Sequence, residues 1–91
     1  GTIILDLKNV DNFYSYYQIK RSLRKDIKQI KLDFNFYLNQ KKINIDNLKI
    51  DNQPNQNINK YLNNFNSVNE NLFNKVTFRN FIKGIFNNYE G

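Results

Sequence analysis

Apolar and polar side chains alternate without a break over residues 30–38, and this pattern constrains the fold more than any other feature of the sequence. Successive side chains of a β-strand point to opposite faces of a sheet, so the pattern predicts a strand with one apolar face. The side chains expected on that face are Ile30, Leu32, Phe34, Phe36 and Leu38. A face of this size has to be covered by helices or occupied by a ligand.

Two further segments have the period of a strand. Residues 2–8 alternate with their apolar side chains mainly at odd positions, and residues 42–50 follow the central segment after a polar turn at 39–41. The short polar connection predicts that the second and third strands form an antiparallel hairpin.

The third strand changes parity along its length. Ile43 and Ile45 share one parity, whereas Leu48 and Ile50 share the other. One extra residue in the strand, a β-bulge near positions 46–47, would return all four side chains to the same face of the sheet. We therefore predict a bulge there.

Between the first and second strands the spacing is helical. Asn9 or Asp11 is a suitable N-cap for a short aromatic helix around residues 13–17. Beyond it, apolar residues at positions 19, 23, 27 and 30 predict one or two further short helices with a basic outer face. The side chains expected on this basic face are Arg21, Arg24, Lys25 and Lys28.

A polar loop at residues 51–55 separates the predicted sheet from two amphipathic helices. Residues 57–65 and 77–89 both repeat apolar side chains at three- and four-residue intervals, and residues 66–71 form a polar connection between them. Thr77 is the expected N-cap of the last helix.

These elements predict an α+β fold, with a small antiparallel sheet of about three strands and short helices, two of them C-terminal. Ninety-one residues suffice for one small domain or a fragment of a larger protein. Residues 1–52 would provide the strand, helix and hairpin, and residues 53–91 the helical part. Because the sequence opens with Gly1 and not with Met, we expect a segment of a longer chain.

The residue inventory excludes most catalytic chemistry. The chain has no Cys and no His, so thiol nucleophiles, imidazole bases and the usual zinc or haem ligands are missing. No glycine-rich phosphate loop is present, and no two carboxylates stand at a separation that suggests acid–base work. We therefore expect a protein that is not an enzyme, with no cofactor and no metal site.

The net charge of +6 is concentrated in residues 20–31. A basic patch of this kind can meet nucleic acid, an anionic lipid surface or an acidic protein, and it can also be a solvated face. In the nucleic-acid alternative, Tyr14, Tyr16, Tyr17 and Tyr37 would stack on bases while Arg21, Arg24 and Lys28 contact phosphates. No recognised RNA- or DNA-binding signature accompanies these residues. A small basic protein-interaction module is a further alternative.

The apolar sheet face leaves two alternatives open. The C-terminal helices could cover it as a closed core, or it could form part of a trough for acyl chains. In the second case the lipid-groove candidates are Leu32, Phe34, Phe36, Ile43 and Ile45. The basic face would then lie near anionic headgroups.

Five strings resemble the C-terminal region of AsmA-like proteins of Gram-negative bacteria, in the form found in A/T-rich alphaproteobacterial members. They are NFYSYYQI at 12–19, RKDIKQI at 24–30, NLKID at 47–51, NKVTFRNF at 74–81 and YEG at 89–91. The resemblance covers most of the chain.

The resemblance implies a function in outer-membrane biogenesis. Family members are long periplasmic proteins, tethered to the inner membrane by a helix outside this segment. Their repeated β-sheet units form an apolar groove for phospholipid transport. This chain would be the non-enzymatic terminal module of such a protein, with phospholipid, an anionic membrane surface and the rest of the parent chain as partners.

Overall fold

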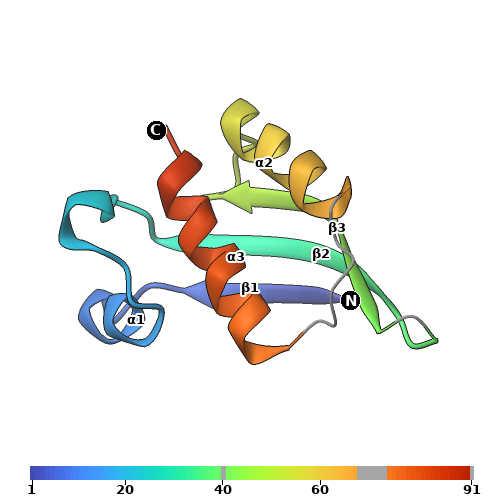
Figure 1. Ribbon diagram of the computed structural model, residues 1–91. Helices are drawn as coiled ribbons and strands as arrows, with labels where there is room; N and C mark the ends of the chain where they lie inside the picture. The colour runs from blue at the N-terminus through green and yellow to red at the C-terminus, as the bar shows by residue number, and fades with distance from the viewer. Residues whose placement is uncertain (40, 68–73, 91) are drawn as a thin grey trace.

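The computed structural model describes residues 1–39, 41–67 and 74–90 (Figure 1). It has a three-stranded antiparallel sheet and two C-terminal helices, which confirms the predicted α+β class. In chain order the elements are β1 (Thr2–Asp6), α1 (Val10–Tyr16), the 3₁₀ turn η1 (Arg21–Leu23), β2 (Gln29–Tyr37), β3 (Lys42–Ile50), α2 (Gln56–Ser67) and α3 (Lys75–Asn88).

The long alternating segment forms the central strand of the sheet. The strand order is β1-β2-β3, and both neighbours run antiparallel to β2. The β1 register begins with Thr2 opposite Asp33, and the hairpin pairs end with Tyr37 opposite Lys42. The alternating pattern thus predicted the strands and the β2–β3 hairpin, whereas the pairing of β1 with β2 is added by the structure.

The predicted β-bulge is confirmed. The register between β2 and β3 shifts between Asp33 and Phe34, which lie opposite Asn47 and Ile45, so Asp46 is the extra residue. The Asp46 carboxylate accepts hydrogen bonds from the side-chain amides of Asn35 (2.5 Å) and Asn44 (2.7 Å). These bonds hold the bulge on the polar side of the sheet, while the apolar residues on either side of it stay buried.

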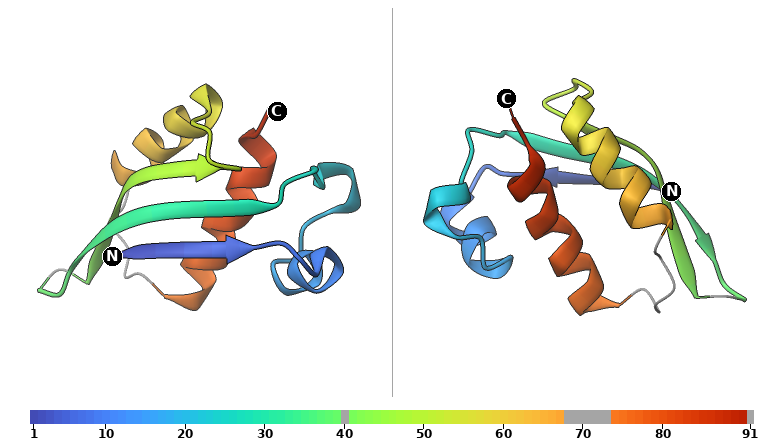
Figure 2. Two further views of the ribbon diagram at one scale, coloured as in Figure 1. Left: turned by 180° about the vertical axis from the view of Figure 1, so that it is seen from behind. Right: turned by 45° about the horizontal axis from the view of Figure 1, so that its top comes forward.

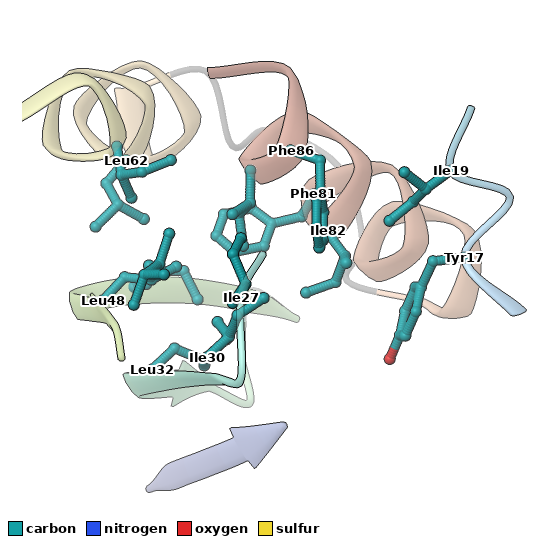
Figure 3. Close-up of a cluster of buried hydrophobic side chains, with 14 of the residues drawn as sticks. Tyr17, Ile19, Ile27, Ile30, Leu32, Leu48, Leu62, Phe81, Ile82 and Phe86 are labelled. Atoms are coloured by element: carbon teal, nitrogen blue, oxygen red, sulfur yellow. The ribbon is translucent and has the colours of Figure 1, made fainter. Parts of the chain in front are cut away.

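Helices α2 and α3 cover one face of the sheet and lie against each other (Figure 2). Side chains from the sheet and from both helices form a single core (Figure 3). Residues before and after position 52 therefore contribute to one folded unit. The fully buried large side chains are Ile30, Leu32, Leu48, Ile58, Phe81, Ile82, Ile85 and Phe86.

The helix starts follow asparagine caps. Asn9 caps α1 through a 3.4 Å bond from the Asn12 N–H, as predicted. The prediction for the last helix is wrong: α3 begins at Lys75, and Asn74 is its N-cap. The Asn74 side-chain oxygen accepts the Thr77 N–H at 2.9 Å, which is the bond an N-cap makes to the third helical residue. Thr77 therefore lies inside the helix.

Helix α2 extends past the predicted end. It contains residues 66–67, which were expected to begin the polar connection, and residues 68–71 of that connection lie outside the described part of the chain. Asn55 precedes the helix, and its side-chain oxygen accepts the Ile58 N–H at 3.1 Å.

The predicted basic helices after α1 do not form. Only the single 3₁₀ turn η1 is present, because Ile30, the last residue of the apparent helical repeat, belongs to β2. The chain before β2 is held instead by Asp51, whose carboxylate accepts the main-chain N–H groups of Lys28 (2.9 Å) and Gln29 (2.8 Å). Ile19 and Ile27 still reach the core, but from irregular chain.

Candidate functional site

The apolar sheet face is closed over most of its length. Of the five groove candidates, Leu32, Ile43 and Ile45 lie in the core with exposed fractions of 0%, 2% and 2%. The closed-core alternative therefore holds for these three side chains, because α2 and α3 cover them. Phe34 is half-buried, and Phe36 reaches the surface.

The face becomes accessible at the end of the β2–β3 hairpin. This end extends beyond the helices (Figure 2) and carries three consecutive exposed apolar residues, Phe36, Tyr37 and Leu38. The turn is closed by the Lys41 N–H, which donates to the Leu38 carbonyl at 3.3 Å. We call the five residues Phe36, Tyr37, Leu38, Lys41 and Lys42 the hairpin tip.

The basic candidates lie at the other end of the molecule. Arg21, Lys25 and Lys28 are exposed, on and after η1, and the segment that carries them is far from the hairpin tip in Figure 1. Arg24 is half-buried, with its guanidinium carbon 4.8 Å from the centre of the Tyr14 ring. Because the basic candidates and Phe36 occupy opposite ends of a body 37 Å long, they do not form one headgroup-and-acyl-chain site.

The four tyrosines of the nucleic-acid alternative are not gathered on one surface. Tyr14 is buried, and its hydroxyl donates to the Lys25 carbonyl at 2.7 Å. Tyr17 is also buried, and this burial is the main cause of the raised pKa of its hydroxyl. Tyr16 is exposed beside Arg79, and Tyr37 lies in the hairpin tip. Two of the four thus complete the core, and the others are at opposite ends.

A feature that the sequence did not reveal is the open edge of β1. Gly1 and Phe34 exchange two main-chain hydrogen bonds (2.7 and 2.8 Å), and the Leu7 N–H donates to the Lys28 carbonyl (2.9 Å). In an antiparallel pair such bonds recur at every second residue. The N–H and C=O groups of Thr2, Ile4 and Asp6 therefore point away from β2, toward the side where no described residue forms a neighbouring strand.

The layer of helices that covers the sheet also extends past the edge of β1. Ile3 and Leu5 face the core but are only half-buried, whereas the core-facing Ile30 and Leu32 of β2 are fully buried. Helix α3 crosses the strands obliquely, and its N-terminal turn, which carries Val76, extends past β1 (Figure 1). Beside β1 there is thus an unpaired strand edge with a helix end above it.

The acidic side chains for which hydrogen bonds are described stabilise the fold. Asp33 accepts the Thr2 hydroxyl at 2.7 Å, and this bond is the main cause of the lowered pKa of its carboxyl group. In the described ranges no three acidic, His or Cys side chains stand together as a metal site. None of the helices seen there is long and apolar enough to span a bilayer.

Comparisons with protein-family models, with curated proteins and with solved structures gave no match to this chain. The resemblance to AsmA-like proteins accordingly rests on the sequence strings. The structure adds two candidate sites, the open edge of β1 and the hairpin tip.

Proposed function

We propose that this unit is a non-catalytic end module that joins its three strands, through β1, to a longer β-sheet of the same protein. The observation that carries the proposal is the outward-pointing row of main-chain groups at Thr2, Ile4 and Asp6. Such a row is a template for one more strand. The two edges of the sheet differ, because Asn66 occupies the main-chain groups of Ile45 on the outer side of β3.

The packing of the helices also supports the addition of a strand beside β1. A strand placed beside β1 would lie under the N-terminal turn of α3 and would cover Ile3 and Leu5 with its own inward-facing side chains. Burying apolar area in this way is favourable by about 25 cal/mol per Å². The segment that fits is an extended one of about five residues, with alternating apolar side chains.

The resemblance to AsmA-like proteins supplies the setting of this proposal. The module would end the sheet of a periplasmic protein that acts in outer-membrane biogenesis or phospholipid transport. Since Leu32, Ile43 and Ile45 are covered by helices, this unit would close the end of a lipid groove and would not extend it through its own core.

Hydrogen exchange tests the pairing of β1. In the 91-residue chain the amides of Thr2, Ile4 and Asp6 should exchange rapidly, whereas in the full gene product they should be protected. Ile4→Pro removes one outward N–H without breaking a bond to β2. It should therefore abolish that protection at Thr2 and Asp6 but leave the 91-residue chain folded. Rapid exchange of these amides in the full gene product would refute the proposal.

A further inference from the structure

The hairpin tip concentrates exposed apolar surface. Phe36, Tyr37 and Leu38 are 44%, 51% and 77% exposed, and they are consecutive. No two of the other large exposed apolar side chains of the described residues are consecutive in the chain; they are Ile4 on β1, Val10 and Tyr16 at the two ends of α1, and Val76 on α3. A single exposed apolar residue is ordinary, whereas a cluster at a projecting end indicates a contact surface.

The tip is a projection of the sheet. Phe36 and Tyr37 are still paired with β3, opposite Ile43 and Lys42. Phe36 and Tyr37 point to opposite faces of the hairpin, because side chains alternate along a strand, and the exposed Leu38 follows them in the turn. Apolar groups therefore surround the end of the hairpin on both faces, a shape suited to insertion into a medium that encloses it.

Basic residues stand directly behind the apolar ones. Lys41 is exposed and Lys42 is partly exposed, and no acidic residue occurs between Asp33 and Asp46. Asp46 is itself turned to two side-chain amides, those of Asn35 and Asn44. The tip thus combines apolar side chains at its end with a local excess of positive charge.

We propose that the hairpin tip inserts into the interfacial region of an anionic phospholipid surface. Leu38 and Phe36 would enter the boundary between headgroups and acyl chains, and Tyr37 would keep its hydroxyl among the headgroups. Lys41 and Lys42 would lie close to lipid phosphates, where each basic side chain adds to the attraction.

The size of the tip favours lipid over a protein partner. A stable protein interface buries about 800 Å² on each side, whereas a buried aromatic side chain contributes about 150–250 Å². Three side chains at the end of a hairpin supply less than such an interface needs. A lipid surface has no such minimum, and binding to it scales with buried apolar area and charge. This inference is independent of strand pairing at β1.

The chain has no tryptophan, so one introduced indole reports its own surroundings. Tyr37→Trp places it in the hairpin tip. Tyr16→Trp is the matched control, since Tyr16 is 50% exposed and lies on α1, at the other end of the molecule with the basic segment. Both variants are titrated with vesicles of phosphatidylcholine containing about one-third phosphatidylglycerol, after circular dichroism has shown the native fold.

The expected result is a blue shift of the Tyr37→Trp emission, with protection from acrylamide, and an unchanged Tyr16→Trp emission. Vesicles of phosphatidylcholine alone should give a weaker response, and added salt should weaken binding to the anionic vesicles. Adding Leu38→Asp to Tyr37→Trp should lower the partition constant about tenfold or more, because it places a carboxylate where the leucine enters the interface. Leu38 is too exposed for this change to disturb the core.

Three results would overturn the inference. A shift of Tyr16→Trp without a shift of Tyr37→Trp would place the contact at the basic segment. No shift in either variant would show that the hairpin tip does not bind lipid, and binding of a protein partner would then be the alternative. Binding that persists unchanged with Leu38→Asp would show that the apolar end does not insert.

Discussion

The side-chain amide of Asn66 forms two hydrogen bonds with the main chain of Ile45. Its Nδ2 donates to the Ile45 carbonyl at 2.9 Å, and its Oδ1 accepts the Ile45 N–H at 3.0 Å. The amide thus takes the place of one residue of a neighbouring strand. A helical side chain in this way satisfies the outer edge of β3 next to the bulge, whereas no strand among residues 1–39, 41–67 and 74–90 pairs with the outer edge of β1.

Asn66→Ala should lower the free energy of unfolding by about 1–3 kcal/mol, because it leaves a partly buried N–H and C=O of β3 without partners. Urea denaturation measures the loss, and faster hydrogen exchange at Ile45 locates it. Asn63→Ala is the control, since Asn63 is exposed on the same helix. Equal stability of the two variants would mean that water replaces the amide at no cost.

Gly84 makes room for Tyr61 where α2 and α3 meet. The Tyr61 ring stacks on Phe81 with centroids 5.4 Å apart, and its hydroxyl donates to the Phe81 carbonyl at 2.9 Å. A Cβ at position 84 would lie 2.1 Å from the Tyr61 hydroxyl oxygen, closer than two non-bonded heavy atoms can approach each other. The only interior glycine of the chain is therefore explained by a tyrosine on the neighbouring helix.

Gly84→Ala should have opposite effects in two backgrounds. In the native sequence it should destabilise the protein by about 1–3 kcal/mol, since Tyr61 has to leave its stacked and bonded position. In a Tyr61→Ala background the clash is gone, and the same change should stabilise by about 0.5–1 kcal/mol through helix propensity. A double-mutant cycle in urea measures the difference, and additivity of the two changes would contradict the proposed contact.

The Tyr61 hydroxyl also makes stability depend on alkaline pH. Burial raises the pKa of Tyr61 to about 12, from an ordinary value of 10.0. Between these values the unfolded chain loses the proton first, so the stabilisation is complete below pH 10 and is lost as the pH rises toward 12. Because the ring is partly open to solvent, we expect a loss of about 1–2 kcal/mol, less than the full difference in pKa would give.

Comparison with Tyr61→Phe isolates this effect from the other titrating groups. The variant should be about 1 kcal/mol less stable near neutral pH, where the hydrogen bond to Phe81 is missing. Its stability should then approach that of the native sequence as the pH rises from 10 to 12. Parallel pH curves for the two proteins would contradict a buried, bonded hydroxyl.

The strands could be predicted from the sequence because their signal is local. The alternation over residues 30–38 and the parity change between Ile45 and Leu48 together indicated the hairpin and its bulge, and both are present. Each observation needs only the two-residue period of a strand. The pairing of β1 with β2 was less accessible, since the helix α1 and the 3₁₀ turn η1 separate the two strands in the chain.

Features that depend on long-range partners could not be predicted in this way. The four apolar residues from Ile19 to Ile30 have helical spacing. Ile30 nevertheless lies in the central strand, where it is paired with both neighbouring strands. Which predicted groove side chains are covered depends on how far α2 and α3 reach along the sheet. Leu32 is fully buried whereas Phe36 is 44% exposed, and no pattern within β2 indicates where the cover of the helices ends.

Asp51 connects the end of β3 with the start of β2. Its Oδ1 accepts the N–H groups of Lys28 and Gln29, and its own N–H donates to the Gln29 carbonyl at 3.0 Å. Asp51 and Asn52 both have left-handed backbone angles, with φ of 51° and 64°. Aspartate and asparagine tolerate this region better than other residues with a Cβ, so both the conformation and the hydrogen bonds suit these side chains.

Two substitutions at position 51 separate these contributions. Asp51→Gly relieves the backbone strain but removes the acceptor, and Asp51→Asn keeps an acceptor oxygen while it removes the charge. Asp51→Gly should cost about 1–2 kcal/mol in the free energy of unfolding and should speed hydrogen exchange at Lys28 and Gln29. Asp51→Asn should cost less than half as much. If Asp51→Gly were as stable as the native sequence, the turn would be held by its backbone angles, and the two amides would not need the carboxylate.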